Sequence, residues 1–422
     1  MARKKKSSQP VNIAQLESLK QINLNAAGLD IGSAGIWACV PEGRSDHSVR
    51  VFDTFTVELH ALADWLEQCG IETVAMESTG IYWLPVYEIL ENRGFDVILV
   101  NAHVIKSVSG RKSDLVDCQW IQQLHTYGLL PASFRPDAEI ATLRAYVRHR
   151  ENLLRYRAAH IQHMQKSLQL MNIQLPNIIS DITGVTGMKI IRSILAGERN
   201  PLILAQFRDP RCKSTEEEIA KSLEGNYRPE HLFALRQAVE LFDFYNQQLA
   251  ACDVEMEALY ANSHSQVETP PPPSSKRKRR RRKANYPRFD LRSHLYRICG
   301  VDLTEVDGID VLIAQDVLAE IGLDMDKWPT VKHFASWLRL CPNNDISGGK
   351  VLRRSTKKTN NRTNNAFRMA AQSVGRSDSA LGAFYRRIKY RHGAPKAVTA
   401  TAHKIARIVY VMLKDRKPYQ DL

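Results

Sequence analysis

Four acidic residues in the first third of the chain have the types and positions of a metal-binding site. Asp30 follows an apolar run and has a glycine two residues to either side, Glu77 ends a second apolar run, and Asp114 and Asp117 are three residues apart. Residues three apart share one face of a helix, and carboxylate oxygens are the ligands that Mg²⁺ prefers. Two such ions roughly 4 Å apart stabilise both the attacking and the leaving oxygen of a phosphoryl displacement. The four acids therefore predict a two-metal magnesium site that cleaves a phosphodiester, with each acid a metal ligand and a catalytic residue.

Each acid has a simpler explanation when it is taken alone. An Asp after a strand is commonly a turn residue, and two acids three apart on a helix commonly belong to a solvated face. The four together favour the site, because carboxylates this close without a cation would repel one another and raise at least one pKa. Gly28 and Gly32 favour it as well, since residues without Cβ let a backbone or a phosphate approach closely.

The segments that contain the acids alternate in a way that would bring them together. After a basic start, three antiparallel strands are expected in succession, then strands and helices in alternation. The expected strands comprise the run up to Asp30, residues 36–40 after the turn 32–35, residues 49–52 with 55–57, and then 73–77 and 96–101; the expected helices are 60–68, 82–92 and about 113–127. This order predicts an α/β fold with a mixed sheet, in which functional groups gather at strand ends.

The composition favours a nucleic acid as partner. The 422 residues include 59 Lys and Arg against 45 Asp and Glu, which gives a net charge of +14 and a pI near 9.4. A chain of this length, with 44% hydrophobic residues, can build two or three domains. Cations in excess on a surface bind polyanions through counterion release, so nucleic acid is expected ahead of a membrane surface.

The cysteines and the apolar runs bear on where the protein works. The seven cysteines form no CxxC pair and no regular spacing, so we expect reduced, buried thiols in place of a zinc module or disulfides. The start has no signal-peptide pattern, and no stretch of 18 apolar residues occurs. These patterns predict a soluble cytoplasmic protein with no membrane partner.

Two heptad patterns in the middle of the chain predict long paired helices. Apolar residues recur every seven positions over 140–171 and again over 235–259. An antiparallel coiled-coil arm is one interpretation, and a helical hairpin packed on its own domain is the other. Arg150 and Arg157 occupy the first seam, which indicates a specified register or partner. The segment 175–230 between the patterns predicts short helices to which the sequence assigns no chemistry.

A linker with its own composition follows the second heptad pattern. Four prolines at 270–273 stiffen the chain as an extended spacer, and the eight cations after Ser275 cannot fold into a core. We expect these cations to contact RNA or DNA phosphates. They are Lys276, Arg277, Lys278, Arg279, Arg280, Arg281, Arg282 and Lys283.

The residues of three motifs resemble those of transposases of the IS110 type, including their IS1111 branch. These motifs are Leu29-Asp-Ile-Gly-Ser33, Met76-Glu-Ser-Thr-Gly80 and Lys112-Ser-Asp-Leu-Val-Asp117. The resemblance implies a ribonuclease H-like, RuvC-like domain whose acidic quartet binds magnesium. It also implies the fold class: an α/β N-terminal domain with a mixed sheet, a helical coiled-coil middle and a mainly α-helical C-terminal domain.

A second part of the resemblance concerns a serine. The segment 337–358 is similar to the one that contains the catalytic serine of these transposases, with Ser347 at the serine position. A serine ahead of two glycines can expose its hydroxyl on a mobile loop, and neighbouring cations can stabilise a pentavalent phosphate. Attack by Ser347 would give a covalent phosphoserine, so that strands are cut and rejoined without ATP. An ordinary turn is the alternative for Ser347, and Ser355 is the competing nucleophile.

The resemblance also indicates domain boundaries and partners. We expect a basic arm at 1–22, a RuvC-like DEDD nuclease domain at 23–135, a helical coiled-coil region with an insertion at 136–262, the Pro/Arg-rich linker at 263–290 and a C-terminal transposase domain at 291–422. It implies a prokaryotic, nucleoid-associated DNA recombinase that a structured noncoding RNA guides to donor and target DNA. It further implies a dimer or a dimer of dimers in which different subunits assemble one site. Besides the linker cations, nucleic-acid contacts are expected from Arg111, Lys112, Lys350, Arg353, Arg354, Lys357, Lys358 and Arg362.

Three other function classes stay open at this point. A metal-dependent RuvC-like junction nuclease would need the acidic quartet but not Ser347. An actin-like ATPase would share the Asp-x-Gly opening at Asp30, although no second loop of that kind is evident later in the chain. A noncatalytic RNA-binding scaffold would tolerate alanine at all four acids.

Overall fold

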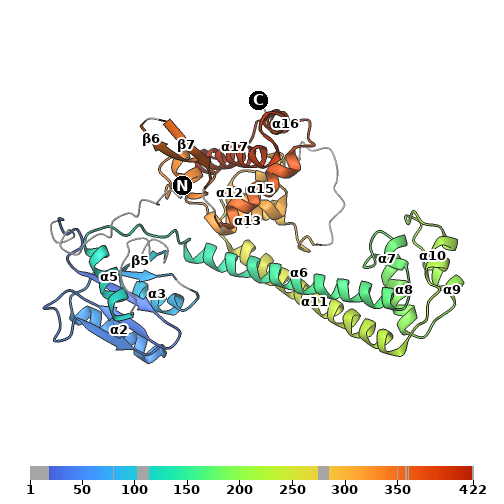
Figure 1. Ribbon diagram of the computed structural model, residues 1–422, viewed down its shortest axis with the longest axis horizontal. Coiled ribbons are helices and arrows are strands. Elements are labelled where there is room, and N and C mark those ends of the chain that lie inside the picture. Colours follow the sequence, from blue (N-terminus) through green and yellow to red (C-terminus); the bar gives the residue numbers. More distant parts are fainter. Residues whose placement is uncertain are drawn as a thin grey trace, which may run out of the picture. The chain divides into compact units, whose positions relative to one another are not determined.

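A computed structural model describes most of the chain, and it divides into two units that we consider separately. The described residues are 19–78, 80–101, 114–273, 285–348, 350–356, 359 and 361–420. The N-terminal unit ends at Arg135 and the C-terminal unit begins at Pro136. Figure 1 shows both, with most of the helices and some of the strands labelled. In the described part of the chain, no helix combines the length and the apolar character needed to cross a membrane.

The N-terminal unit is built on a mixed sheet. Its strands lie in the order β3-β2-β1-β4-β5, with the first three antiparallel in succession and with β4 and β5 parallel to β1. The predicted α/β fold class is therefore confirmed. Its elements are β1 (Ala26–Ile31), β2 (Ile36–Cys39), β3 (Val49–Phe52), α2 (Thr56–Gln68), β4 (Thr73–Glu77), α3 (Trp83–Asn92), β5 (Asp96–Val100) and α5 (Asp114–Thr126).

One predicted strand segment is wrong. Residues 55–57 were expected to extend the third strand, but Phe55 is the N-cap of α2, and the helix starts at Thr56. Glu58 lies in the first turn of α2, where the helix dipole favours a negative charge. Leu59, Leu62 and Leu66 are buried at helical spacing, and this apolar stripe outweighs the β-propensity of a short Phe-Thr-Val run.

Helices cover both faces of the sheet, and each face has its own core. On one face, Leu29 and Met76 pack with Leu62 of α2 and Leu90 of α3. On the other face, Ala75 and Val100 pack with Ile121 and Leu124 of α5. Because successive strand residues point to opposite faces, these two clusters establish which side of the sheet each strand residue faces.

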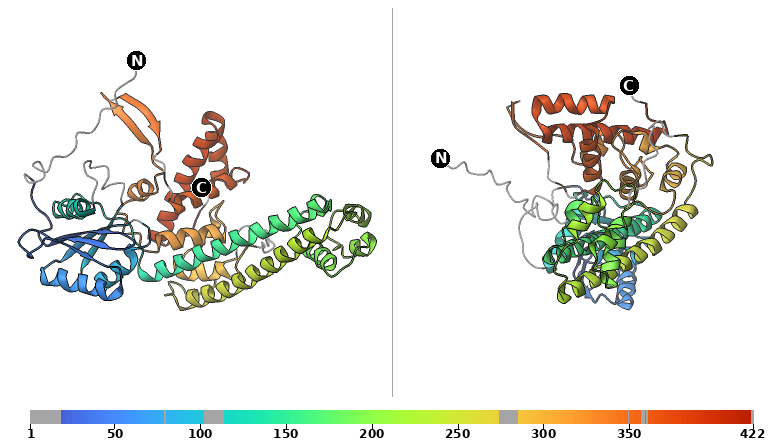
Figure 2. Two further views of the ribbon diagram at one scale, coloured as in Figure 1. Left: turned by 60° about the horizontal axis from the view of Figure 1, so that its bottom comes forward. Right: turned by 90° about the vertical axis from the view of Figure 1, so that its right-hand side faces the viewer.

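The C-terminal unit begins with a long two-helix arm. The helices α6 (Ala138–Leu170) and α11 (Pro229–Asn262) lie side by side for most of their length, as Figures 1 and 2 show. The apolar heptad positions Leu168, Leu235 and Leu249 are buried, and the predicted paired helices are confirmed. Four helices connect α6 to α11 and share a hydrophobic core with the adjoining ends of both: α7 (Leu175–Ile178), α8 (Val185–Leu195), α9 (Pro201–Ala205) and α10 (Glu216–Ser222).

The rest of the C-terminal unit is mainly helical, as predicted, apart from one β-hairpin. The first half of α6 packs against α13 of this part, so the arm is also a hairpin docked on its own unit. The elements are α12 (Leu291–Cys299), the 3₁₀ helix η1 (Leu303–Glu305), α13 (Val311–Ile321), α14 (Val331–Trp337), β6 (Asn343–Ser347), β7 (Lys350–Ser355), α15 (Arg362–Val374), α16 (Ala380–His392) and α17 (Ala394–Asp415).

Candidate functional site

Two of the predicted acids lie on neighbouring parallel strands and face the same side of the sheet. The register pairs Gly28 with Ala75 and Leu29 with Met76, so Asp30 and Glu77 are the next residues along β1 and β4. Ala75 of β4 packs under α5. Because every second strand residue points to the same face, Glu77 faces the α5 side of the sheet, and so does Asp30, two residues after Gly28, the partner of Ala75 on β1. Both side chains are partly exposed at the carboxyl ends of their strands, which is the edge where functional groups of such sheets gather.

A glycine lets α5 lie directly on β1. A Cβ at Gly28 would stand 2.3 Å from the Gln122 nitrogen and 2.5 Å from the Cys118 carbonyl oxygen, closer than non-bonded atoms approach. The predicted close approach of a backbone at Gly28 is thus confirmed. Polar contacts hold the far end of α5, where the Thr126 carbonyl accepts hydrogen bonds from Ile22 and Asn23.

The direction of α5 brings its first turns toward Asp30. The end of α5 at Thr126 lies beside Asn23, Gln122 donates to the Ala26 carbonyl at 3.4 Å, and Cys118 lies over Gly28. The helix therefore runs antiparallel to β1. The first turn of α5, which contains Asp114 and Asp117, is therefore directed toward the end of β1 that contains Asp30.

The four acids offer the right donor chemistry for a divalent metal ion. All ligands would be carboxylate oxygens, which hard divalent cations prefer. Asp117 is described and partly exposed, whereas α5 begins at Asp114 and the structure does not describe that side chain. Among the side chains that are described, which include Asp30, Glu77 and Asp117, no three His, Cys, Asp or Glu form a group that could hold a metal. The three described acids of the quartet are therefore not brought together as a metal site in this structure.

The buried polar groups under α5 have structural roles. His125 Nε2 lies 2.9 Å from the Thr73 hydroxyl, and burial lowers the pKa of His125, so the ring is neutral at physiological pH. The Cys39 thiol of β2 is hydrogen-bonded with Cys118 of α5, and this bond together with burial raises the pKa of Cys39. Neither thiol is in a disulfide, since all seven cysteines are free as predicted, although Cys212 and Cys341 are only partly buried and not fully buried as expected.

Ser347 lies at the tip of the β6–β7 hairpin, where the sequence predicted a mobile loop. It pairs with Lys350 of β7, and Gly348, which follows it, has a φ of +56°, a conformation that favours glycine. Ser347 is exposed. The hairpin projects from the helices of its unit, as Figures 1 and 2 show, and neither strand packs extensively on another element. The competing nucleophile Ser355 pairs with Asn343 at the opposite end of the hairpin.

The predicted phosphate-contacting cations have different outcomes. Lys350 is exposed beside Ser347, and the backbones of Arg353 and Arg354 belong to β7. Arg362 forms an ion pair of 2.6 Å with Glu151 of α6 while its side chain stays 45% exposed, which leaves room for a second anion. The other predicted cations lie outside the described residues: Arg111, Lys112, the run 276–283, Lys357 and Lys358.

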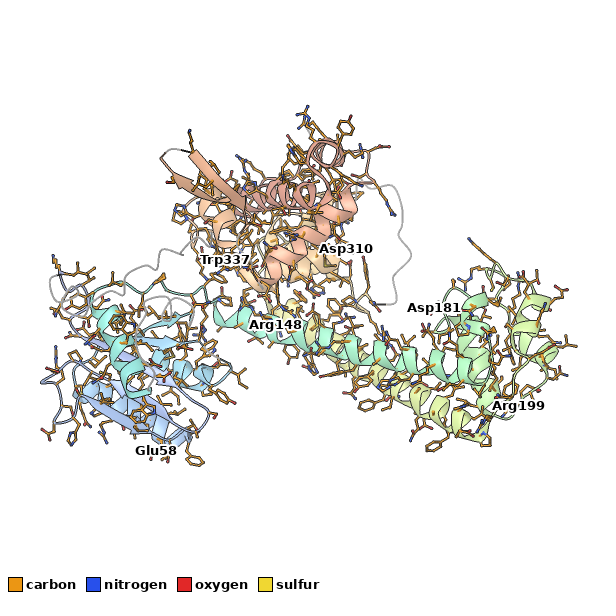
Figure 3. All side chains as sticks on the ribbon, in the orientation of Figure 1. Glu58, Arg148, Asp181, Arg199, Asp310 and Trp337 are labelled. Atoms are coloured by element: carbon orange, nitrogen blue, oxygen red, sulfur yellow. The ribbon has the colours of Figure 1, made fainter. Side chains whose placement is uncertain are left out.

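The seam arginines of the arm have intrachain partners. Arg150 is buried and its Nε lies 2.6 Å from a carboxylate oxygen of buried Asp253 on α11. Arg157 donates to the Asn246 and Asn285 side-chain oxygens at 2.8 and 2.7 Å. The sequence identified the arginines but not these partners. Figure 3 shows Arg148, two residues before Arg150, and Asp310 at the start of α13; Arg148 pairs with Glu320 of α13 at 2.8 Å.

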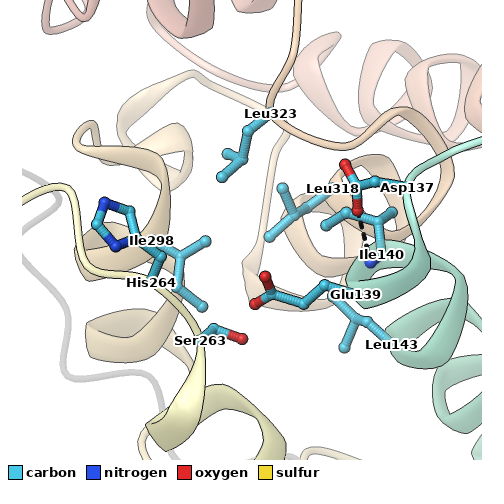
Figure 4. Close-up of a pocket in the computed structure, with 9 residues that line it drawn as sticks. All are labelled: Asp137, Glu139, Ile140, Leu143, Ser263, His264, Ile298, Leu318 and Leu323. Atoms are coloured by element: carbon cyan, nitrogen blue, oxygen red, sulfur yellow. Dashed lines mark hydrogen bonds between the residues drawn. The ribbon is translucent and has the colours of Figure 1, made fainter.

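A small cavity in the C-terminal unit is not a substrate site. It has a volume of about 90 Å³ and lies where α6 begins (Figure 4). Most of its lining residues are apolar, and Asp137 and Glu139 are its two acidic residues. Asp137 is the N-cap of α6, and its carboxylate accepts a hydrogen bond of 2.9 Å from the Ile140 nitrogen. Binding sites for small molecules typically have about 300 Å³ or more, so this cavity is too small for a nucleotide.

Comparison with known protein families agrees with this geometry. Residues 27–173, from β1 through α6, match the model of the DEDD transposase domain of IS110 elements, which is described as a transposase. Residues 301–386, which include the β6–β7 hairpin, match the model described as the transposase IS116/IS110/IS902 family. The two matches together span more than half of the chain. The chain belongs to the IS110 family of transposases.

An IS110-family transposase is an enzyme that acts on DNA, and its DEDD domain implies a divalent metal ion. The mixed sheet with α5 and the mainly helical C-terminal unit fit the ribonuclease H-like fold and the helical transposase domain expected of this family. A search of curated proteins found no match.

Proposed function

We propose that this transposase exchanges DNA strands through a phosphoserine intermediate, with Ser347 as nucleophile and Asp30, Glu77, Asp114 and Asp117 as ligands of Mg²⁺. The observation that supports the proposal best is the placement of the exposed Ser347 hydroxyl at a projecting hairpin tip beside Lys350. A nucleophile presented in this way can reach a phosphodiester that lies outside its own unit.

Each residue has a defined part in the proposed step. The Ser347 oxygen forms a bond to phosphorus as the bond from phosphorus to one deoxyribose oxygen breaks. Ser347 loses its proton, and the released sugar oxygen gains one. Lys350 stabilises negative charge on the phosphate. The four carboxylates would hold the metal, which when bound stabilises the attacking and leaving oxygens. Reversal on a second strand end returns the free serine.

The guide and the assembly belong to the same proposal. The chain has a net charge of +14 and a run of eight linker cations, which suit a large polyanion such as a structured noncoding RNA. We propose that this RNA pairs with donor and target DNA and that the protein contacts backbone and shape. The protein is proposed to act as a dimer or a dimer of dimers. The predicted domain boundaries at 22, 135, 262 and 290 are part of this proposal.

The decisive experiment is to look for the covalent intermediate. The purified protein, with the RNA that accompanies it and with Mg²⁺, is mixed with labelled donor and target DNA, and adducts are separated under denaturing conditions and mapped by mass spectrometry. An adduct at Ser347 that disappears in Ser347→Ala supports the proposal. Ser355→Ala is the matched control and should retain the adduct.

Two outcomes would redirect the proposal. An adduct at Ser355 would move the nucleophile to the other end of the hairpin. Unchanged DNA cleavage by Ser347→Ala, together with loss of cleavage in Glu77→Gln, would indicate a metal-dependent junction nuclease without covalent serine chemistry.

A further inference from the structure

A groove along the last helix of the C-terminal unit has no role in the chemistry above. It runs between α17, the starts of α14 and α16, and the segment 417–420, and its volume is about 470 Å³. Pockets for small ligands usually have about 300 to 1,000 Å³, so this groove has the size for one nucleotide. Ser347 and the four acids do not line it.

Among the described residues that line the groove, the charged ones are all cations. They are Lys404, Arg407 and Lys417. Within the described residues Arg407 forms no ion pair, and Lys404 is held at 5.0 Å from the ring centroid of Phe384. Lys417 lies 3.6 Å from Asp415, yet its side chain stays 73% exposed. The groove therefore attracts an anion.

Apart from Gln420, the rest of the lining consists of apolar or aromatic residues. Val411 of α17 is 43% exposed, and Leu381 and Ile408 lie beside it with the aromatic residue Tyr419. An inorganic anion would leave this surface unused, and a purely apolar peptide would leave Lys404 and Arg407 without an anionic partner. A nucleotide has both an anionic phosphate and a flat apolar base, and unpaired bases bind by stacking on side chains next to phosphate-binding cations.

We propose that this groove binds one unpaired nucleotide of a single-stranded nucleic acid segment, with the phosphate at Lys404 and Arg407 and the base against Val411 and Tyr419. A duplex does not fit, because its bases are stacked inside and it offers only its backbone. The strand is either a loop of RNA or a displaced DNA strand. The inference is independent of Ser347 as nucleophile, so Ser347→Ala should bind as the wild type does.

Photo-crosslinking tests the site directly, because the result reports position as well as affinity. The full-length protein is irradiated with an RNA of about ten nucleotides containing 4-thiouridine, with the matching DNA containing 4-thiothymidine, and with each in duplex form; single-stranded sites of about this length are typical. We expect the single strands, but not the duplexes, to crosslink to peptides that span 404–420. The arm with the higher yield identifies RNA or DNA as the source. Crosslinks elsewhere but none in 404–420 would overturn the proposal.

Three variants separate the groove from general electrostatics. Lys404→Gln with Arg407→Gln should lower the crosslink yield at the groove and reduce the slope of log affinity against log salt by about 0.7, since the two cations share one phosphate and each neutralised phosphate on a single strand contributes about 0.7. Lys189→Gln with Lys221→Gln removes two exposed cations from the arm tip and should leave the groove crosslink unchanged. Val411→Asp should reduce the crosslink as well. Wild-type crosslinking by Val411→Asp would show that no base lies on the apolar surface and would overturn the proposal.

Discussion

At the scale of single residues, the candidate metal site depends on a glycine, a residue without a side chain. Gly28 lies under α5, and the helix can approach β1 only because a Cβ is absent there. If a side chain moved α5 outward, Asp114 and Asp117 would move away from Asp30 and Glu77. The spacing of the acids therefore depends on backbone contact as much as on the acids.

Gly28→Ala should consequently destabilise the protein and abolish DNA cleavage. The new methyl group would stand 2.3 Å from the Gln122 nitrogen, and overpacking of this kind typically costs about 1–3 kcal/mol. Urea denaturation and a cleavage assay measure the two effects. Gly35→Ala is the matched control, because a Cβ there would meet nothing closer than 3.7 Å. Equal stability and activity of the two variants would contradict the role assigned to Gly28.

At the scale of elements, the arm is held in register by a buried ion pair. Arg150 and Asp253 are 5% and 3% exposed, and Asp253 also accepts a hydrogen bond of 3.0 Å from the Arg288 nitrogen. Arg150 donates to the Asn285 carbonyl at 3.0 Å. The pair thus joins α6 to α11, and its hydrogen bonds to Asn285 and Arg288 also hold the segment that precedes α12.

Asp253→Ala should destabilise the C-terminal unit by about 3–5 kcal/mol, because it leaves Arg150 buried without a counter-charge. Replacing both residues, as Arg150→Met with Asp253→Leu, should recover most of the loss. Asp243→Ala is the control, since the Arg192–Asp243 pair on the same arm is 57% and 40% exposed and such pairs contribute about 0–1 kcal/mol. The midpoint of urea unfolding ranks the variants, and equal midpoints for Asp253→Ala and Asp243→Ala would contradict the role of the buried pair.

Helix packing between α6, α13 and α15 should make stability depend on pH. The pKa of Asp316 is raised to about 7, mainly by burial. The nearby carboxylates Glu151, Glu320 and Asp310 contribute to this rise in pKa, and the positive charge of Arg362 partly offsets them. In the unfolded chain an Asp has a pKa of about 3.9. Between these values the folded state holds a proton that the unfolded state has lost, so this contribution to stability falls as pH rises from about 4 to about 7.

Asp316→Asn should therefore remove part of the pH dependence and be more stable than the wild type above neutral pH. The difference between the two urea midpoints, measured at several pH values, should grow as pH rises toward about 7 and then level off. Asp324→Asn, at a carboxylate that is 50% exposed, should keep the wild-type slope. A constant difference between Asp316→Asn and the wild type across this range would refute the assignment.

Much at this scale could be predicted from the sequence, and the misses have physical causes. Apolar periodicity located β4, α3 and the arm helices, because their buried residues recur at regular spacing. It failed at 55–57, where three residues have β-propensity but the apolar stripe of α2 begins one turn later. The two glycines after Ser347 favoured a loop, whereas the structure places Ser347 at the end of β6. The described side chains Val351 and Leu352 of β7 are both exposed, so they give no alternation of buried and exposed residues. The groove cations Lys404 and Arg407 were missed because only the fold places them beside the segment 417–420.

At the scale of the whole molecule, the proposed chemistry divides between the two units. The four acids belong to the N-terminal unit and Ser347 to the C-terminal unit. Residues that act on one phosphodiester can then come from one chain or from two chains of an oligomer. Sequence motifs identify each half of the site, but neither motif contains information on which chain supplies the other half.

Mixed oligomers decide between these arrangements. A Ser347→Ala chain retains all four acids, and a Glu77→Gln chain retains the serine, so neither alone should form the phosphoserine adduct. If the site is assembled between subunits, co-expression of the two should restore the adduct, and only on the Glu77→Gln chain, which a larger tag distinguishes on a gel. Random pairing into symmetric dimers would give about a quarter of the wild-type number of intact sites. If each chain supplies its own acids and serine, no combination has a complete site, and the co-expressed mixture should form no adduct at all.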